Sequence, residues 1–129
     1  MTKAPRLACA TLVVADYDDA ISWFTGKLGF LLVEDAPQGG GKRFVVVAPA
    51  GGGAGLLLAR AAGAEQTARI GAQTGGRVAF FLHTDDFVRA HAAMTAKGVK
   101  FLEAPRDEPY GRVVVFADLY GNKWDLVEP

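Results

Sequence analysis

A motif, Asp118-Leu119-Tyr120-Gly121-Asn122-Lys123-Trp124-Asp125, follows one apolar run and leads into another near the end of the chain. Gly121 and Asn122 tolerate positive φ angles, so the motif predicts a hairpin turn at residues 118–122. The flanking runs, 112–117 and 123–128, are rich in apolar and β-branched residues, which is typical of strands. The motif therefore predicts an antiparallel strand pair in this part of the protein.

Two copies of one strand, helix and strand pattern make up most of the chain. In each copy an apolar run leads to an acidic residue, a helical stretch, a glycine and a second apolar run. The matched positions are Asp16 and Asp85, Gly29 and Gly98, and Glu34 and Glu103. A register shifted by one residue fits the helix interiors better, so the alignment stays open by one position. A single duplication over most of a small chain predicts two paired modules.

The helix of the first copy has a start signal, an apolar stripe and a stop signal. Asp16 is a favourable N-cap, and Asp18 and Asp19 place negative charge at the positive end of a helix. Gly29 ends the helix because glycine adopts the left-handed conformation at low cost. The apolar stripe has the spacing of a helix on a sheet and consists of Tyr17, Ile21, Phe24 and Leu28.

Three further strands complete each module, so the fold class predicted is α+β with two βαβββ modules. In the first module, residues 6–60, these strands are 30–35, 43–48 and 55–60, with turn-forming runs at 37–41 and 49–53. In the second module, residues 77–128, the strands are 77–84, 99–103, 112–117 and 123–128, with a helix at 86–97. Residues 61–76 are polar and contain several glycines, which predicts a linker or a lid. Residues 1–129 are expected to form one domain.

Composition limits the classes of partner. Lys plus Arg and Asp plus Glu both number 14, so no net charge favours nucleic acid or an anionic membrane. The apolar stretches are too short to span a membrane, and residues 1–6 lack the apolar run of a secretory signal. A single cysteine, Cys9, excludes an internal disulfide and is consistent with a reducing compartment. We therefore expect a cytoplasmic protein with no nucleic-acid or membrane partner.

The chain resembles the vicinal oxygen chelate superfamily of glyoxalase I, bleomycin-resistance proteins, extradiol dioxygenases and fosfomycin-resistance enzymes. One signature is the strand, Asp16, helix and Leu28-Gly29-Phe30 series. The other is the stretch from Phe116 to Leu126, which is similar to the family's Phe, x, Asp, Pro, x, Gly, Asn, x, x, Glu, Leu. The resemblance covers nearly the whole chain. It implies that the two modules curl into an incomplete barrel around a cavity, and that the protein is a homodimer.

The resemblance also implies where a metal would be held. Metal-dependent members place four side chains in the cavity, typically His or Gln on the first and fifth strands and Glu on the fourth and eighth. On this chain the four positions are Cys9, Leu57 or Leu58, Val78 or Ala79, and Asp125. A divalent metal needs three or more N, O or S donors, and Leu, Val and Ala supply none. We therefore predict no cofactor, with a Zn, Ni, Fe or Mn site as the alternative.

Asp125 is the best candidate for a catalytic group. Burial would oppose its ionisation, so it could carry a proton, whereas the structural alternative is an ion pair with Arg43 or Arg112. Tyr110 and Arg112 could grip an anionic or aromatic ligand, although residues 108–111 also have the composition of an ordinary turn. His83 ends a predicted strand and faces either the cavity or the helix layer.

Two functions from different classes follow. The first is a binding protein that takes up a partly apolar small molecule, as bleomycin-resistance proteins do, without a metal. The second is a glyoxalase-like or dioxygenase-like enzyme with an atypical site around Asp125, Cys9 and His83. Beside these two functions stands a purely structural alternative, a dimer module with a filled cavity. The missing metal ligands favour the binding protein. Its predicted ligand-binding residues are Cys9, Arg43, Leu57, Val78, His83, Tyr110, Arg112 and Asp125.

Overall fold

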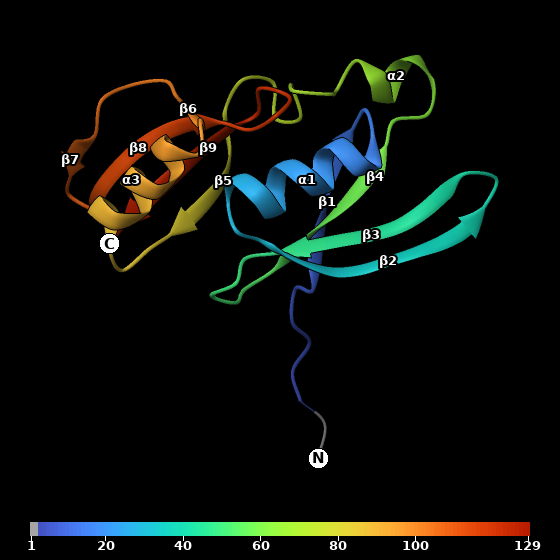
Figure 1. The fold of residues 1–129 in the computed structure, drawn as a ribbon, viewed down its shortest axis with the longest axis horizontal. Coiled ribbons are helices and arrows are strands. Elements are labelled where there is room, and N and C mark those ends of the chain that lie inside the picture. The colour runs from blue at the N-terminus through green and yellow to red at the C-terminus, as the bar shows by residue number, and fades with distance from the viewer. Residues whose placement is uncertain (1–2) are drawn as a thin grey trace. The chain divides into compact units, whose positions relative to one another are not determined.

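The computed structural model describes residues 3–129 and divides into two compact units, an N-terminal unit up to Thr67 and a C-terminal unit from Ala68 to Pro129 (Figure 1). Each unit contains one sheet and a helix that packs on it. The α+β class and the two-module organisation are confirmed. No helix in the described part of the chain combines the length and apolar character needed to cross a lipid bilayer.

The N-terminal unit has the predicted βαβββ order. Its elements are β1 (Cys9–Val14), α1 (Tyr17–Lys27), β2 (Leu31–Gly39), β3 (Lys42–Ala48) and β4 (Gly55–Arg60), followed by the short helix α2 (Gly63–Thr67). The strand order in the sheet is β1-β4-β3-β2. β1 and β4 are parallel, whereas β3 is antiparallel to both β2 and β4.

Helix α1 forms for the reasons predicted from its caps and apolar stripe. The Asp16 carboxylate accepts a hydrogen bond from the Asp19 amide at 2.8 Å, which satisfies one free donor of the first turn. Tyr17, Ala20 and Phe24 are buried on the face that packs against β3 and β4. Gly29 follows the helix with a φ of 68°, a conformation that favours glycine.

The ladder between β3 and β4 is unusually short. Its paired residues are Val46 with Leu57 and Val47 with Leu56. Over 42–45 and 58–60 the two strands remain paired with their outer neighbours, β2 and β1. At this split the Arg43 amide donates a hydrogen bond to the Tyr17 hydroxyl at 3.2 Å. A side chain of α1 thus satisfies a main-chain donor beside the gap between two strands.

The C-terminal unit repeats the arrangement with added short strands. Its elements are β5 (Val78–His83), α3 (Phe87–Ala96), β6 (Lys100–Phe101), β7 (Arg106–Glu108), β8 (Gly111–Ala117) and β9 (Lys123–Glu128). The strand order is β5-β9-β8-β6, and β7 also pairs with β8. β5 and β9 are parallel. The Asp86 carboxylate caps α3 by accepting from the Arg89 amide at 3.1 Å, and Phe87 and Met94 are buried.

The turn at residues 118–122 is built around the buried Asp118 carboxylate. It accepts hydrogen bonds from the amides of Tyr120 and Asn122 at 3.0 Å, from the Asn122 side chain at 3.2 Å and from Trp124 Nε1 at 3.1 Å. Burial raises the pKa of Asp118, and these donors oppose the rise. The predicted hairpin turn is confirmed, and its acidic residue is structural.

Residues 68–76 are attached to this turn. The Gln73 amide donates to the Asn122 side-chain oxygen at 3.2 Å. Gly71 has a φ of 76° and lies so close to the Tyr120 carbonyl that no side chain fits there. This part of the predicted linker therefore packs within the C-terminal unit.

Four details differ from the sequence prediction. The predicted linker contains the short helix α2, Gly63–Thr67. β2 continues through Pro37, which an edge strand tolerates beside a bulge. β7 was not predicted, because its charged sequence lacks the apolar alternation by which strands are recognised. β6 is shorter than the predicted strand 99–103.

Candidate functional site

The helix α3 covers one face of the C-terminal sheet, and Asp125 lies on the other. Trp124 belongs to the helix-covered face, where its ring lies 5.7 Å from that of Phe116, and successive residues of a strand point to opposite faces. Asp125 is paired across the strands with Phe81 and Val115. Phe81 is 64% exposed, so this face presents a large apolar ring beside a carboxyl group.

Asp125 is buried without a hydrogen bond to one of its oxygens. The residue is 5% exposed, and its Oδ1 has no partner within residues 3–129. Burial raises the pKa of Asp125, the charge of Arg106 opposes the rise and that of Glu103 adds to it. A buried acceptor left unpaired is costly, so this oxygen is suited to a donor on a bound molecule.

Arg106 is the centre of a charged cluster on the same face as Asp125. Its guanidinium lies 2.7 Å from the Glu108 carboxylate and 3.1 Å from that of Glu103. The Tyr110 hydroxyl is 3.4 Å from Arg106 Nη1, and Glu103 also accepts from the Val115 amide at 3.0 Å. The two carboxylates therefore more than balance the single positive charge of Arg106.

The structure does not bring Arg112 to Tyr110 or to Asp125. Arg112 lies over the Phe87 ring at 5.4 Å, on the helix-covered face, and 3.8 Å from the Asp107 carboxylate. Arg43 forms its ion pairs with Asp18 and Asp35. The alternative in which Asp125 pairs with Arg112 is therefore wrong, because Arg112 points to the other face of the sheet, whereas the pairing with Arg43 stays a prediction.

The positions that hold a metal in metal-dependent relatives lack donors here. Leu57 lies between Thr11 and Val46, and Val78 is opposite Lys123. Across the described residues, no group of three His, Cys, Asp or Glu side chains could hold an ion. The donor set therefore does not fit the divalent metal that the resemblance implies.

Two further predicted residues can be placed. Cys9 is a half-buried free thiol opposite Gly55 in the N-terminal sheet. His83 is exposed at the end of β5, and the alternation of the strand places it on the same face as Phe81. This answers the open question of its direction, since α3 covers the opposite face.

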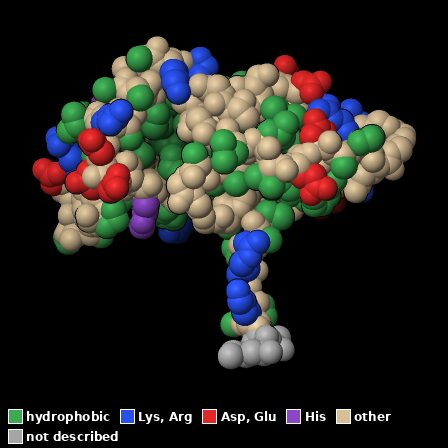
Figure 2. Space-filling view, turned by 60° about the horizontal axis from the view of Figure 1, so that its bottom comes forward, with side chains coloured by type: hydrophobic (Ala, Val, Ile, Leu, Met, Phe, Trp, Pro, Cys, Tyr) green, Lys and Arg blue, Asp and Glu red, His purple; other side chains and the backbone are tan. Residues whose placement is uncertain are grey.

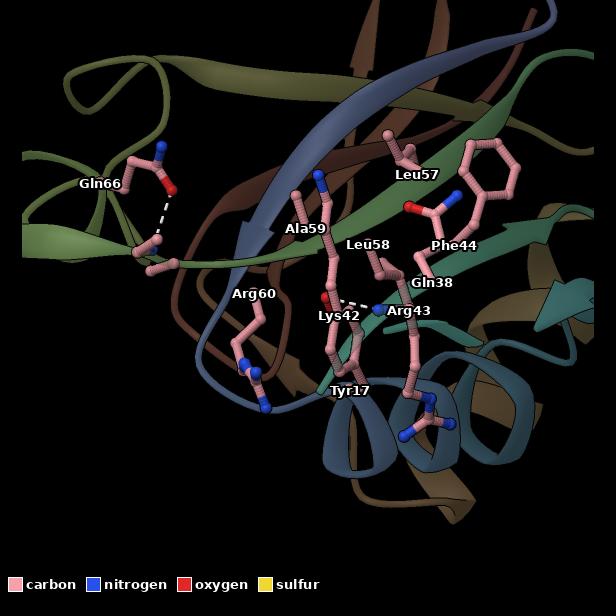
Figure 3. Close-up of a pocket in the computed structure, with 12 residues that line it drawn as sticks. Tyr17, Gln38, Lys42, Arg43, Phe44, Leu57, Leu58, Ala59, Arg60 and Gln66 are labelled. Carbon is pink, nitrogen blue, oxygen red and sulfur yellow. Dashed lines mark hydrogen bonds between the residues drawn. The ribbon is translucent and has the colours of Figure 1, made fainter. Parts of the chain in front are cut away.

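A pocket of about 600 Å³ lies in the N-terminal unit, where β3 and β4 separate (Figure 3). Apolar and basic side chains make up much of its wall, together with two amide side chains. The apolar residues are Phe44, Leu57, Leu58 and Ala59, the basic ones are Lys42, Arg43 and Arg60, and the amides are Gln38 and Gln66. Such a mixture is typical of small-molecule sites.

Tyr17 lies in this pocket between two guanidinium groups (Figure 3). The Cζ atoms of Arg43 and Arg60 are each 5.1 Å from the centre of its ring. Arg43 is held by Asp35 at 2.7 Å and Asp18 at 3.0 Å, and the hydrogen bond from Arg43 lowers the pKa of Asp35. Arg60 Nη2 donates to the Gly41 carbonyl at 3.2 Å.

Arg43 and Leu57, two of the predicted ligand-binding residues, line the same pocket. Sequence reasoning missed Lys42 and Arg60 in the N-terminal unit and Phe81 and Arg106 in the C-terminal one. Phe81 had no usable signal, because it is adjacent to Phe80 in the sequence and only the strand register shows which of the two rings is exposed. The two basic pocket residues had none, because their role depends on the separation of β3 and β4.

The chain belongs to the Glyoxalase/Bleomycin resistance protein/Dioxygenase superfamily, which residues 6–126 match. It is similar to an uncharacterised protein of Shewanella frigidimarina, with 53% identity over 119 residues, covering 91% of this chain and 88% of the relative. Among solved structures it is similar to UcmS2, with a TM-score of 0.84 and 27% identity, covering 98% of this chain and 100% of that one. It is also similar to TnmS3, an antibiotic binding protein from Streptomyces sp. CB03234, with a TM-score of 0.78 and 26% identity, covering 100% and 99% of the two chains.

Proposed function

We propose that this protein binds a small, partly apolar molecule and releases it unchanged, as a sequestering protein. The observation that carries the proposal is the pocket of about 600 Å³ in the N-terminal unit. Its size falls within the range of about 300–1,000 Å³ that is usual for small-molecule sites. TnmS3, which is described as an antibiotic binding protein, supports the same type of function.

We also propose that the protein works without a divalent metal. The support comes from the residues themselves, since leucine and valine stand at positions where metal-dependent relatives carry donors. In the alternative in which the ligand lies on the C-terminal sheet and not in the pocket, Asp125 and Phe81 serve as its polar and its apolar contact. The unpaired Asp125 oxygen would accept a hydrogen bond from that ligand.

A homodimer in the cytoplasm is the proposed state of the protein. Leu31, Leu32 and Val33 form an exposed apolar run on β2, the edge strand of the N-terminal sheet. Exposed apolar runs at a sheet edge favour pairing with another chain. Light scattering coupled to size exclusion should give a dimer mass for the parent and a monomer mass for Leu32→Glu, and a monomeric parent would contradict the proposal.

The second candidate function is a proton-transfer enzyme, and one observation favours it. Asp125 is buried, its pKa is raised by burial and one of its oxygens is unpaired, which are properties of a proton carrier. Recovery of the ligand after long incubation separates the two functions. Mass spectrometry should return the ligand unchanged if the protein only binds it, and a converted product would favour the enzyme.

The binding function is tested by filling the pocket. Bleomycin-type glycopeptides and a panel of small aromatic compounds are screened by thermal shift, and hits are measured by isothermal titration calorimetry. Ala59→Trp places a large side chain on the pocket wall and should abolish binding of the hits. Ala92→Trp adds the same side chain at an exposed position of α3 and should bind like the parent. The proposal fails if no compound binds, or if Ala59→Trp binds as well as the parent does.

A further inference from the structure

We propose that the pocket of the N-terminal unit selects a ligand with one anionic group on an apolar body, and that Arg60 binds the anion, while Lys42, which leaves β3 on the opposite face of the sheet, adds positive charge to the pocket (Figure 3). This inference rests on the proposed function and adds the chemical class of the ligand. The overall composition gives no hint of it, since the charges of the chain balance. Figure 2 shows basic and acidic side chains interspersed over the face in view, so the selectivity would be local to the pocket.

The pocket has an excess of positive charge. Its lining includes Lys42, Arg43 and Arg60, and none of the described residues that line it is acidic. Arg43 is compensated, because it forms ion pairs with Asp18 and Asp35. Within residues 3–129, neither Lys42 nor Arg60 has a carboxylate partner. An apolar cavity with two uncompensated cations is complementary to an anion.

Arg60 is held in place and keeps free donors. Its guanidinium stacks over the Tyr17 ring at 5.1 Å and donates from Nη2 to the Gly41 carbonyl at 3.2 Å (Figure 3). A guanidinium has five N–H donors in a planar fork, so further donors remain for a carboxylate or sulfonate. Because Tyr17 already orients the group, binding an anion costs little additional side-chain entropy.

The rest of the pocket is suited to an apolar body. Phe44, Leu57 and Ala59 are half-buried and lie together on its wall (Figure 3). Both faces of the Tyr17 ring are occupied by guanidinium groups, so Phe44 is the aromatic side chain that remains for a flat ligand. Burial of the body would provide the affinity, and the two cations would provide the discrimination.

Two dyes of nearly the same shape test the inference with the intact protein. 8-Anilinonaphthalene-1-sulfonate carries one sulfonate, and N-phenyl-1-naphthylamine is its neutral counterpart. Both are titrated by fluorescence at low salt, and the sulfonated dye should bind about tenfold more tightly. Its affinity should fall as salt is added, because the contribution of exposed cations is screened. The affinity of the neutral dye should change little.

Charge-removing variants locate the effect. Lys42→Gln and Arg60→Gln should each weaken the sulfonated dye by about tenfold and leave the neutral dye within a factor of two. Lys100→Gln removes the same charge from an exposed site on β6 and should bind both dyes like the parent. Thermal melts show whether each variant is folded. Lys42 serves as the second test if loss of the Arg60 contacts unfolds the protein.

The outcomes separate the two proposals. If both dyes bind equally well, are lost together in Ala59→Trp and are unaffected by Lys42→Gln and Arg60→Gln, the pocket binds ligands but does not select anions, and this inference is overturned. If neither dye binds, or if Ala59→Trp leaves both bound, the pocket is not the binding site and the proposed function itself fails.

Discussion

Replacement of Asp118 by alanine should destabilise the protein more than any loss of a surface carboxylate. The Asp118 side chain accepts hydrogen bonds from the Tyr120 and Asn122 amides, from the Asn122 side chain and from Trp124 Nε1. Asp118 and Asn122 are 6% and 3% exposed, so water cannot replace the lost partner without opening the turn.

The size of the effect follows from these donors. Each buried donor left unpaired costs about 1–3 kcal/mol. The Asn122 amide, the Asn122 side chain and Trp124 Nε1 lose an acceptor, while relief from burying the Asp118 charge offsets part of the loss. We expect a net loss of about 3 kcal/mol, which lowers the melting temperature of a chain of this size by about 10 °C.

Differential scanning calorimetry of the Asp118→Ala variant measures this directly. Asp107→Ala is the matched control, because the Asp107 side chain is 88% exposed and its one ion-pair contact, with Arg112 Nε, is long at 3.8 Å. The control should melt within about 1 °C of the parent. A fall of less than about 2 °C for Asp118→Ala would refute the reasoning that this carboxylate organises the turn.

Three other changes test further parts of the structure. Gly71→Ala should lower the free energy of unfolding in urea by more than about 2 kcal/mol, because its Cβ would collide with the Tyr120 carbonyl. Gly75→Ala is the control, because Gly75 has a similar φ of 69° but open space around it, and this change should cost clearly less. Equal losses in the two variants would mean that the backbone angle alone, and not the collision, sets the cost. Asp125→Asn should raise the melting temperature at pH 7. Because folding raises the pKa of Asp125, the protonated carboxyl stabilises the folded protein at low pH, and this contribution is lost as the pH rises through the folded pKa. The asparagine side chain stays neutral at every pH and avoids that loss. This gain should shrink as pH falls toward 4, and a gain independent of pH would count against a raised pKa. Metal analysis of protein purified without chelator should find far less than one Zn, Ni, Fe or Mn ion per chain, and a stoichiometric ion would reverse the metal-free proposal.

Features with local signals could be predicted from the sequence. The Asp16 carboxylate caps α1 as predicted, because an N-cap interaction needs only residues close in the chain, whereas the cap of α3 is Asp86 and not Asp85, the residue matched to Asp16. The turn at 118–122 was recognisable for the same reason. The buried stripe of α1 followed from spacing in part, since Tyr17 and Phe24 are buried as predicted, whereas Ile21 and Leu28 are half-buried.

Features that depend on strand pairing could not be predicted. The apolar run of β4 would suit a fully paired strand, so nothing local shows that Leu58 and Ala59 have left the ladder with β3. A bulge between Val78 and Phe80 in β5 hides the register that sets Phe81 opposite Asp125. Arg106 belongs to a short charged strand that lacks apolar periodicity. Apart from Arg43 and Leu57, the pocket residues and the surroundings of Asp125 therefore became visible only when segments distant in the sequence were placed together.

The parallel pairing of β1 with β4, and of β5 with β9, has a consequence for biosynthesis. In each case the first strand of the unit finds its neighbour only in the last one, so most of the unit must have left the ribosome before that sheet can close. Until then the apolar edge of β1 or β5 has no native partner. A nascent chain that has emerged only as far as residue 54 would therefore be an exposed target for chaperones, whereas one that has emerged beyond Ala61 has every strand that the first sheet needs.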